Sequence, residues 1–347
     1  MTTYSARAYN AYGQLLGYLR PLSVEAGVVV DGVGEGSVTV AAGGLTAWWK
    51  DVQYLDVWRY GGGGRISRWA CYMVRGWTEK AEGAKRTWRF SGKTLTHLLS
   101  GRPGMQGTTA ANATTRELAE RAVLFGLGVW PTALPLTLAS VDGPSQRLTA
   151  KQTNQATLAA LKSLSDAARA FPLPEPFHFE VLPCLASDGS LSLTVATWTG
   201  EYGADRRVGS GARPVVVWPN AAGTGWEATE DRASLTTVAE LGGGYGRVSG
   251  PALDTPYGEY WGTYKSSTAD SYPQDVTDAL AAVQAGRPVT RLPLSLASDL
   301  DTLDLGLGDV VSVAYGGAWV DGRINVLHTA WNEQGETVSG RVDVEAA

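Results

Sequence analysis

The sequence has few of the side chains from which metal centres and disulfide frameworks are built. Its 347 residues include three histidines and two cysteines, Cys71 and Cys184. One pair of distant cysteines does not make a disulfide framework, so we expect two buried free thiols, as in a protein assembled in a reducing cytosol. No stretch approaches the ~18 apolar residues of a membrane span, and residues 1–7 carry no apolar signal segment. Neither secretion by a signal peptide nor a membrane-spanning segment is expected.

Positive charge is also scarce. The formal net charge is -5 and the isoelectric point is about 5.4, so the chain lacks the basic surface that neutralises nucleic-acid phosphates. Charged residues make up 18% and hydrophobic residues 44% of the chain, which excludes a disordered protein. What is abundant is amphipathic rings: 13 Trp and 14 Tyr stand against 5 Phe. That bias is typical of interfaces and grooves.

Hydrophobic periodicity indicates a mainly β fold with α+β insertions. In the first hundred residues it predicts strands at 37–40, 54–60, 69–77 and 86–92, a turn at 61–64 and a short helix around 95–99. In the middle it predicts a helix from Thr114 or Thr115 to about Phe125, another capped by Asn154, and strands at 177–181 and 191–195. In the last third, the pattern predicts a helix over 271–287, an edge strand at 292–296 containing Pro293, and hairpins over 310–328 and 335–344.

Two glycine-containing motifs resemble phosphate-binding loops but lack required positions. Ser91–Thr94 ends like a phosphate loop, yet Thr87 stands where that loop needs a glycine. Gly32–Gly36 lacks the third glycine of a dinucleotide loop and leads into an alternating strand. We therefore interpret the first as a strand-to-helix turn and the second as a hairpin turn. No Gly-x-Ser-x-Gly elbow supplies a hydrolase nucleophile.

Metal ligation has little support in the sequence. His97, His178 and His328 lie too far apart for the two-ligand spacing of a zinc helix, and we expect packed or hydrogen-bonded strand residues. Four acids near the C-terminal end have a spacing that differs from a calcium loop. They are Asp299, Asp301, Asp304 and Asp309. A solvated acidic turn is the preferred interpretation, with a bound ion as the alternative.

Paired carboxylates near exposed Trp residues are the signature of a glycosidase, so an acidic, Trp-rich β protein has to be considered as one. The available acids are Glu175, Glu180, Glu201, Glu227 and Glu230. Nothing in the sequence places two of them at the required ~5–10 Å. Carbohydrate binding by exposed Trp residues is the non-catalytic form of this alternative, although Trp48, Trp49, Trp58, Trp69, Trp77 and Trp88 mostly occupy predicted strand positions.

Short segments in a fixed order resemble a known family. They are Tyr9–Gly13, Gly34–Val40, Leu55–Tyr60, Phe90–Gly92 with Leu98–Leu99, Gly203–Arg207, Tyr257–Tyr260, Leu307–Val313 and Asp321–Ile324. Together they resemble the tail hub proteins of long-tailed bacteriophages, the baseplate hub-like family that includes the N-terminal regions of tail-associated lysins. The resemblance spans nearly the whole chain, with glutamate displaced in the Tyr257–Tyr260 segment.

The resemblance implies a homotrimer that forms a pseudo-sixfold ring continuing the tail tube. Each subunit would contribute two tube-like β-barrel or sandwich domains, over residues 1–104 and 211–347, with a mixed α/β domain over 105–210 and a helical insertion around 271–287. The implied partners are the distal tail protein, the tape-measure protein and a tail fibre or receptor-binding protein. The ring would sit at the virion tail tip, after assembly in the host cytoplasm.

The resemblance implies that the protein has a structural role in host attachment and genome delivery. We expect no enzymatic activity and assign no catalytic, cofactor-binding or metal-binding residue. Genome DNA would pass through the lumen without specific binding, because acidic walls repel phosphates. We expect some of six acids to face the lumen: Asp51, Asp56, Glu79, Glu82, Asp309 and Asp321. The alternatives are the carbohydrate-binding or carbohydrate-cleaving protein above and a hexameric tube subunit, for which one tube domain needs less than half this length.

Overall fold

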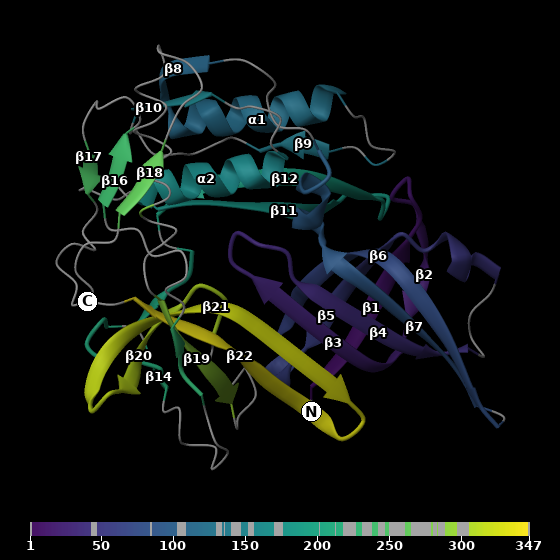
Figure 1. Ribbon diagram of the computed structural model, residues 1–347. Helices are drawn as coiled ribbons and strands as arrows, with labels where there is room; N and C mark the ends of the chain where they lie inside the picture. The colour runs from purple at the N-terminus through teal and green to yellow at the C-terminus, as the bar shows by residue number, and fades with distance from the viewer. Residues whose placement is uncertain are drawn as a thin grey trace.

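Strands dominate the protein, as the sequence predicts (Figure 1). The computed structural model describes residues 2–42, 47–83, 85–102, 109–129, 134, 136–139, 147–151, 156–169, 176–200, 202–211, 213–217, 227–230, 238–241, 247–249, 261–264, 279, 283, 289–296 and 305–345. Within this part of the chain, no helix is both long and apolar enough to cross a membrane.

The N-terminal strands form one antiparallel sheet in the order β3-β4-β7-β6-β5-β1-β2. Their bounds are β1 (Thr3–Tyr9), β2 (Leu15–Leu19), β3 (Pro21–Val29), β4 (Glu35–Ala41), β5 (Tyr54–Tyr60), β6 (Ile66–Glu82) and β7 (Lys85–Thr94). Three short 3-10 helices lie among them: η2 (Ala47–Asp51), η3 (Gly62–Gly64) and η4 (Leu95–Leu99). The four strands, the turn and the short helix predicted in this region are confirmed, and β6 with β7 makes a long hairpin that projects from the body (Figure 1).

Buried residues at every second position explain how the strands of the N-terminal sheet pack. Val38 and Val40 of β4 are buried, and so are Trp88 and Phe90 of the neighbouring β7. Side chains two residues apart on a strand point to the same face, so these four form part of one core cluster beneath the N-terminal sheet. The polar residues between them face outward.

The middle of the chain combines two helices with short sheets. Its elements are β8 (Thr109–Thr114), α1 (Thr115–Val129), β9 (Leu136–Leu138), β10 (Arg147–Lys151), α2 (Thr157–Arg169), β11 (Phe177–Leu185) and β12 (Leu191–Thr199). Helices α1 and α2 lie side by side, and α2 contacts β11 (Figure 1). The predicted cap of α1 is Thr114: its Oγ1 accepts from Glu117 N at 3.2 Å, and the Glu117 carboxylate accepts from Thr114 N at 2.9 Å. The cap predicted at Asn154 lies outside the described residues.

The C-terminal part contains the elements β13 (Asp205–Arg206), β14 (Val216–Val217), β15 (Thr229–Glu230), β16 (Val238–Leu241), β17 (Arg247–Ser249), β18 (Trp261–Tyr264), β19 (Val289–Leu296), β20 (Val310–Tyr315), β21 (Ala318–Asn332) and β22 (Gly335–Glu345). The two predicted closing hairpins are confirmed as β20–β21 and β21–β22. Pro293 pairs with Arg341 of β22. On the other side of β19, the described residues of β15 pair with Thr290 and Arg291. The helix predicted over 271–287 lies outside the described residues, apart from Ala279 and Val283.

One pairing joins the two ends of the chain into a single sheet. Strand β21 runs antiparallel to β3, from Val326 opposite Val29 to Asn332 opposite Ser23. The resulting 14-stranded sheet includes β1–β7 and the C-terminal strands β13–β15 and β19–β22. Three clusters of buried side chains lie against it and the middle segment. The fold is therefore mainly β with α+β insertions, as expected.

The cysteines correct one expectation. Both are free, but only Cys71 is buried, whereas Cys184 is exposed. Cys184 occupies an outward position of β11, opposite Ser192 of β12, so the apolar character of a thiol did not decide its burial.

A glycine in β22 provides a test of how tightly the joined sheet is built. A Cβ at Gly340 would lie 2.2 Å from the backbone oxygen of Val326, whereas one at Gly76 of β6 would meet its nearest neighbour, Ser91 Oγ, at 3.7 Å. We expect Gly340→Ala to lower the free energy of unfolding by about 1–3 kcal/mol through overpacking. Gly76→Ala, the matched control, should instead stabilise by about 0.5 kcal/mol. Urea denaturation of both variants measures this, and equal effects would contradict it.

Candidate functional site

A buried ion pair lies where the N-terminal and C-terminal strands meet. Arg59 of β5 donates from Nε to Glu336 Oε1 at 2.8 Å and from Nη2 to Glu336 Oε2 at 2.7 Å. The two side chains are only 3% and 2% exposed. Such a two-bond contact fixes geometry as well as supplying energy. It holds the β21–β22 hairpin against the N-terminal sheet.

Aromatic side chains complete this contact. Tyr4 OH donates to the Glu336 carboxylate, and the Tyr4 ring lies 5.5 Å from that of Trp331. Trp331 Nε1 in turn donates to the backbone oxygen of Thr2 at 3.0 Å. Burial, together with the neighbouring carboxylate, raises the pKa of Tyr4 well above its ordinary value, so the phenol remains a donor. The sequence offers no local signal for this cluster, because Arg59 and Glu336 are 277 residues apart.

A second polar cluster ties the middle segment to the N-terminal sheet. Asp31, which follows β3 at a φ of 48°, lies 2.8 Å from His178 Nδ1 through its Oδ2 and accepts from Phe179 N at 3.0 Å through its Oδ1. His178 is almost fully buried in β11. A single carboxylate thereby orients both the ring and the backbone of β11.

The same cluster reaches the start of the C-terminal part through Tyr202. Tyr202 OH donates to Glu180 Oε2 at 3.0 Å, and its ring lies 5.4 Å from those of His178 and Trp198. Burial raises the pKa of Glu180, and the charge of Asp31 raises it further, against the opposing effect of the Tyr202 hydrogen bond. Three segments thus meet around two carboxylates. Among the described residues, no group of three or more His, Cys, Asp or Glu is arranged to hold a metal ion.

Asp309 anchors the loop that precedes β20. Its Oδ1 accepts from Ala204 N and its Oδ2 from Gly306 N, both at 2.8 Å. Gly308 beside it has a φ of 82°, and a Cβ there would lie 2.5 Å from Cδ1 of Tyr202. The Leu-Gly-Asp segment therefore needs glycine for its backbone and aspartate for its hydrogen bonds. Both Asp309 oxygens face N–H donors, whereas the other three acids of the calcium alternative lie outside the described residues.

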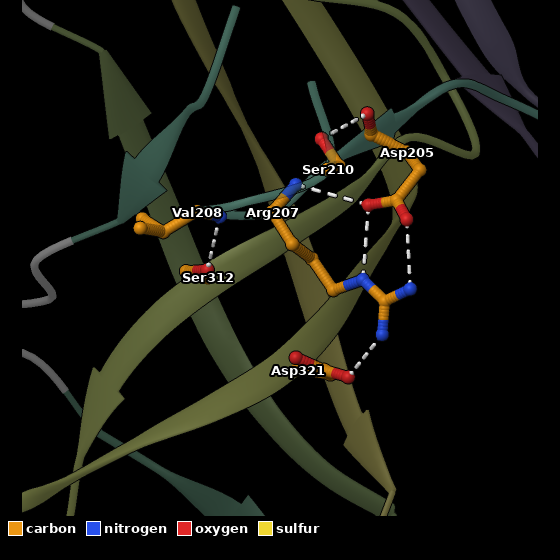
Figure 2. A network of polar contacts seen from close by, with 6 residues as sticks. All are labelled: Asp205, Arg207, Val208, Ser210, Ser312 and Asp321. Carbon is orange, nitrogen blue, oxygen red and sulfur yellow. Dashed lines mark hydrogen bonds and ion pairs between the residues drawn. The ribbon is translucent and has the colours of Figure 1, made fainter. Parts of the chain in front are cut away.

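An exposed network lies next to this loop (Figure 2). Arg207 contacts Asp205 through Nε and Nη2, at 2.9 and 2.7 Å, and Asp321 Oδ2 through Nη1 at 2.7 Å. Val208 N donates to Ser312 Oγ at 3.1 Å, which holds the segment against β20. These residues line a cavity of about 610 Å³ that also includes Trp319.

The structure corrects the list of candidate lumen residues. Asp56 is fully buried, forms an ion pair with Arg68 at 2.8 Å and accepts from Trp58 Nε1 at 2.7 Å. Asp309 is buried as well, so neither lines a channel. The other candidates are exposed and stay a prediction: Asp51, Glu79, Glu82 and Asp321.

The remaining sequence candidates have structural roles where they are described. Thr94 is the last residue of β7, and its Oγ1 accepts a hydrogen bond from Gly34 N at 2.9 Å. The end of strand β7 therefore contacts the turn that contains Gly34. His97 lies in the 3-10 helix η4 rather than in a strand, which corrects that expectation, and His328 lies in β21.

The structure describes three of the five acids that were considered for the glycosidase alternative. Glu230 Oε2 accepts from Thr290 at 3.3 Å and Glu227 is exposed. Glu180 accepts a hydrogen bond from Tyr202, and Glu175 and Glu201 lie outside the described residues.

The fold is shared with bacteriophage tail proteins. A tail protein from Neisseria meningitidis MC58 has a TM-score of 0.54 at 13% identity, with 99% of this chain and 97% of that chain covered. The prophage MuSo2 43 kDa tail protein from Shewanella oneidensis has a TM-score of 0.53 at 13% identity, with 100% and 99% covered. A chain of the Francisella PdpA-VgrG complex has a TM-score of 0.54 at 11% identity, covering 99% of this chain and 52% of that one.

No family model and no curated protein matches the sequence. At such low identity the likeness to solved structures establishes the fold alone. It confirms a mainly β fold like that of tail proteins. The quoted segments around Asp205 and Asp309 lie side by side, because Asp205 of β13 pairs with Val310 of β20. The Tyr257–Tyr260 segment lies outside the described residues.

The Arg59–Glu336 pair yields a stability prediction. Replacing Glu336 with Ala leaves a buried guanidinium without its carboxylate, so we expect a loss of about 3–5 kcal/mol in the free energy of unfolding. The double variant Arg59→Met with Glu336→Leu removes both charges and should recover most of that loss. Chemical denaturation of the single and double variants measures the difference. A double variant as unstable as Glu336→Ala would contradict this account of the pair.

Glu180 yields a pH-dependence prediction. Because its pKa is raised in the folded protein above the ordinary value of 4.5, stability is favoured at low pH and falls as pH rises from that value through the raised one. Glu180→Gln keeps an acceptor for Tyr202 but carries no charge. We expect it to raise the melting temperature at about pH 7 and to change it little near pH 4. The exposed Glu227→Gln is the control, and a pH-independent effect of Glu180→Gln would refute the electrostatic cause.

Proposed function

We propose that this protein is a structural component of a bacteriophage tail or baseplate, and that it is the hub that continues the tail tube at the tip. The observation that carries the proposal is the combination of one sheet joining both ends of the chain with a fold shared, over nearly full length, with phage tail proteins. A tube wall has to be continuous, and the β3–β21 pairing provides that continuity within a subunit.

The proposed subunit has two tube-like β-domains, over residues 1–104 and 211–347, separated by a mixed domain over 105–210. Three copies would present six such domains around a ring. The separate hydrophobic clusters beneath the N-terminal and C-terminal strands support this division. The middle cluster, which lies under α1 and α2, draws Tyr9 and Tyr54 from the N-terminal sheet and so supports a rigid attachment.

The proposed partners are the distal tail protein above the ring, the tape-measure protein in its lumen and a tail fibre or receptor-binding protein below it. Genome DNA would pass without specific binding, and the exposed acids among Asp51, Glu79, Glu82 and Asp321 are the proposed lining. The net charge of -5 supports this role, because acidic walls repel phosphate. The role is mechanical, and we propose no enzymatic activity.

The quaternary state tests the proposal. We expect a particle of about 110 kDa, three times 36.7 kDa, by light scattering after size exclusion, and a ring with threefold symmetry by negative-stain microscopy. Closed rings of identical subunits follow from head-to-tail contacts. A monomer that gains thermal stability with oligosaccharides would instead favour the carbohydrate-binding alternative.

A further inference from the structure

Large hydrophobic side chains are exposed along one edge of the sheet. Strand β2 ends the strand order and, in the described part of the chain, pairs with β1 alone. On β2, Leu15 is 37% and Tyr18 is 69% exposed. Tyr12, which precedes β2, is 68% exposed, and Leu22, at the start of β3, is 37% exposed. We call these four residues the β2 patch. An open apolar edge of this kind promotes aggregation unless another chain covers it.

Two arginines lie beside the β2 patch. Residues 1–24 contain Arg7 and Arg20 but no Asp or Glu. The Arg7 guanidinium lies 5.8 Å from the ring centre of Tyr18 and 4.8 Å from that of Trp58. Next to the patch, a cavity of about 1130 Å³ is lined in part by Tyr18, Arg20 and Trp331, together with Glu333 and with Glu336, which is paired with Arg59. The edge thus offers aromatic surface, guanidinium groups and room for an incoming side chain.

A second exposed apolar surface lies in the C-terminal part. Val208 is 65% and Trp319 is 56% exposed, and both line the 610 Å³ cavity together with Asp205, Arg207 and Asp321. We call these five residues the Trp319 patch. It carries two carboxylates against one guanidinium (Figure 2), so its net charge is opposite in sign to that of Arg7 and Arg20 beside the β2 patch. Strands β2 and β20 lie on opposite sides of the molecule (Figure 1).

We infer that the β2 patch of one copy binds the Trp319 patch of a second copy. The inference rests on the proposed trimer and names the surfaces that build it. Two different surfaces on opposite sides of one subunit make a heterologous contact, and such contacts close into a ring when the rotation allows. Aromatic residues and Arg are the residues that dominate binding energy at such interfaces. Asp321 is the proposed partner of Arg20, which places it between two subunits and removes it from the proposed lumen lining.

Single substitutions test the two patches. Tyr18→Glu and Trp319→Glu each replace an exposed ring with a charge, so the fold should persist while the contact is lost. We expect either variant to raise the concentration of half-dissociation at least tenfold, measured by mass photometry and light scattering. Leu124→Glu is the matched control, because Leu124 of α1 is 50% exposed and lies in neither patch. It should behave like the unchanged protein.

Charge reversal tests the pairing itself. Arg20→Glu and Asp321→Arg should each weaken the assembly by placing like charges against each other across the contact. The double variant should restore it, because the exchanged charges are again opposite wherever two copies meet. A trimer that withstands all single substitutions, or a double variant weaker than either single one, would overturn the inference while leaving the trimer in place. A wild-type protein that is monomeric at all concentrations would overturn both.

Discussion

The antiparallel pairing of β3 with β21 is the contact on which the rest of the structure depends. It joins strands from opposite ends of the chain, and without it the N-terminal and C-terminal strands would form separate sheets with two more open edges. Backbone hydrogen bonds between strands carry little information about which residues should meet. The Arg59–Glu336 pair supplies that information, since a buried charge is stabilised only at the register that brings its partner to it.

The same principle applies at the second junction. Asp31 accepts a backbone hydrogen bond from β11 and contacts His178, while Glu180 binds Tyr202 from the segment that leads to β13. Buried polar networks are costly when any member is unsatisfied. Displacing one segment would therefore leave buried polar groups of the other segments without their hydrogen-bond partners. The three parts of the chain are consequently held in one arrangement.

Local structure could be read from the sequence, and long-range contacts could not. The alternation at 54–60 and the helix start at Thr114 or Thr115 are set by neighbours within a few residues, so pattern alone predicts them. Arg59 lies in that same predicted strand, yet nothing nearby shows that its partner is Glu336. The lumen hypothesis failed at Asp56 for the same reason: its partner Arg68 lies across the β5–β6 hairpin, and only the fold reveals that the pair is internal.

The chemistry of the buried carboxylates supports a structural role. A general acid or base has to reach a substrate, but Asp56, Glu180, Asp309 and Glu336 each contact a donor from another strand or loop. In each case the carboxylate fastens two segments together. Six of the ten large hydrophobic side chains that are exposed in the described part of the chain lie in the β2 and Trp319 patches, which we propose to serve association. These four acids therefore act in the packing of the chain, whereas the exposed rings of Tyr12, Tyr18 and Trp319 are available for contact with another chain.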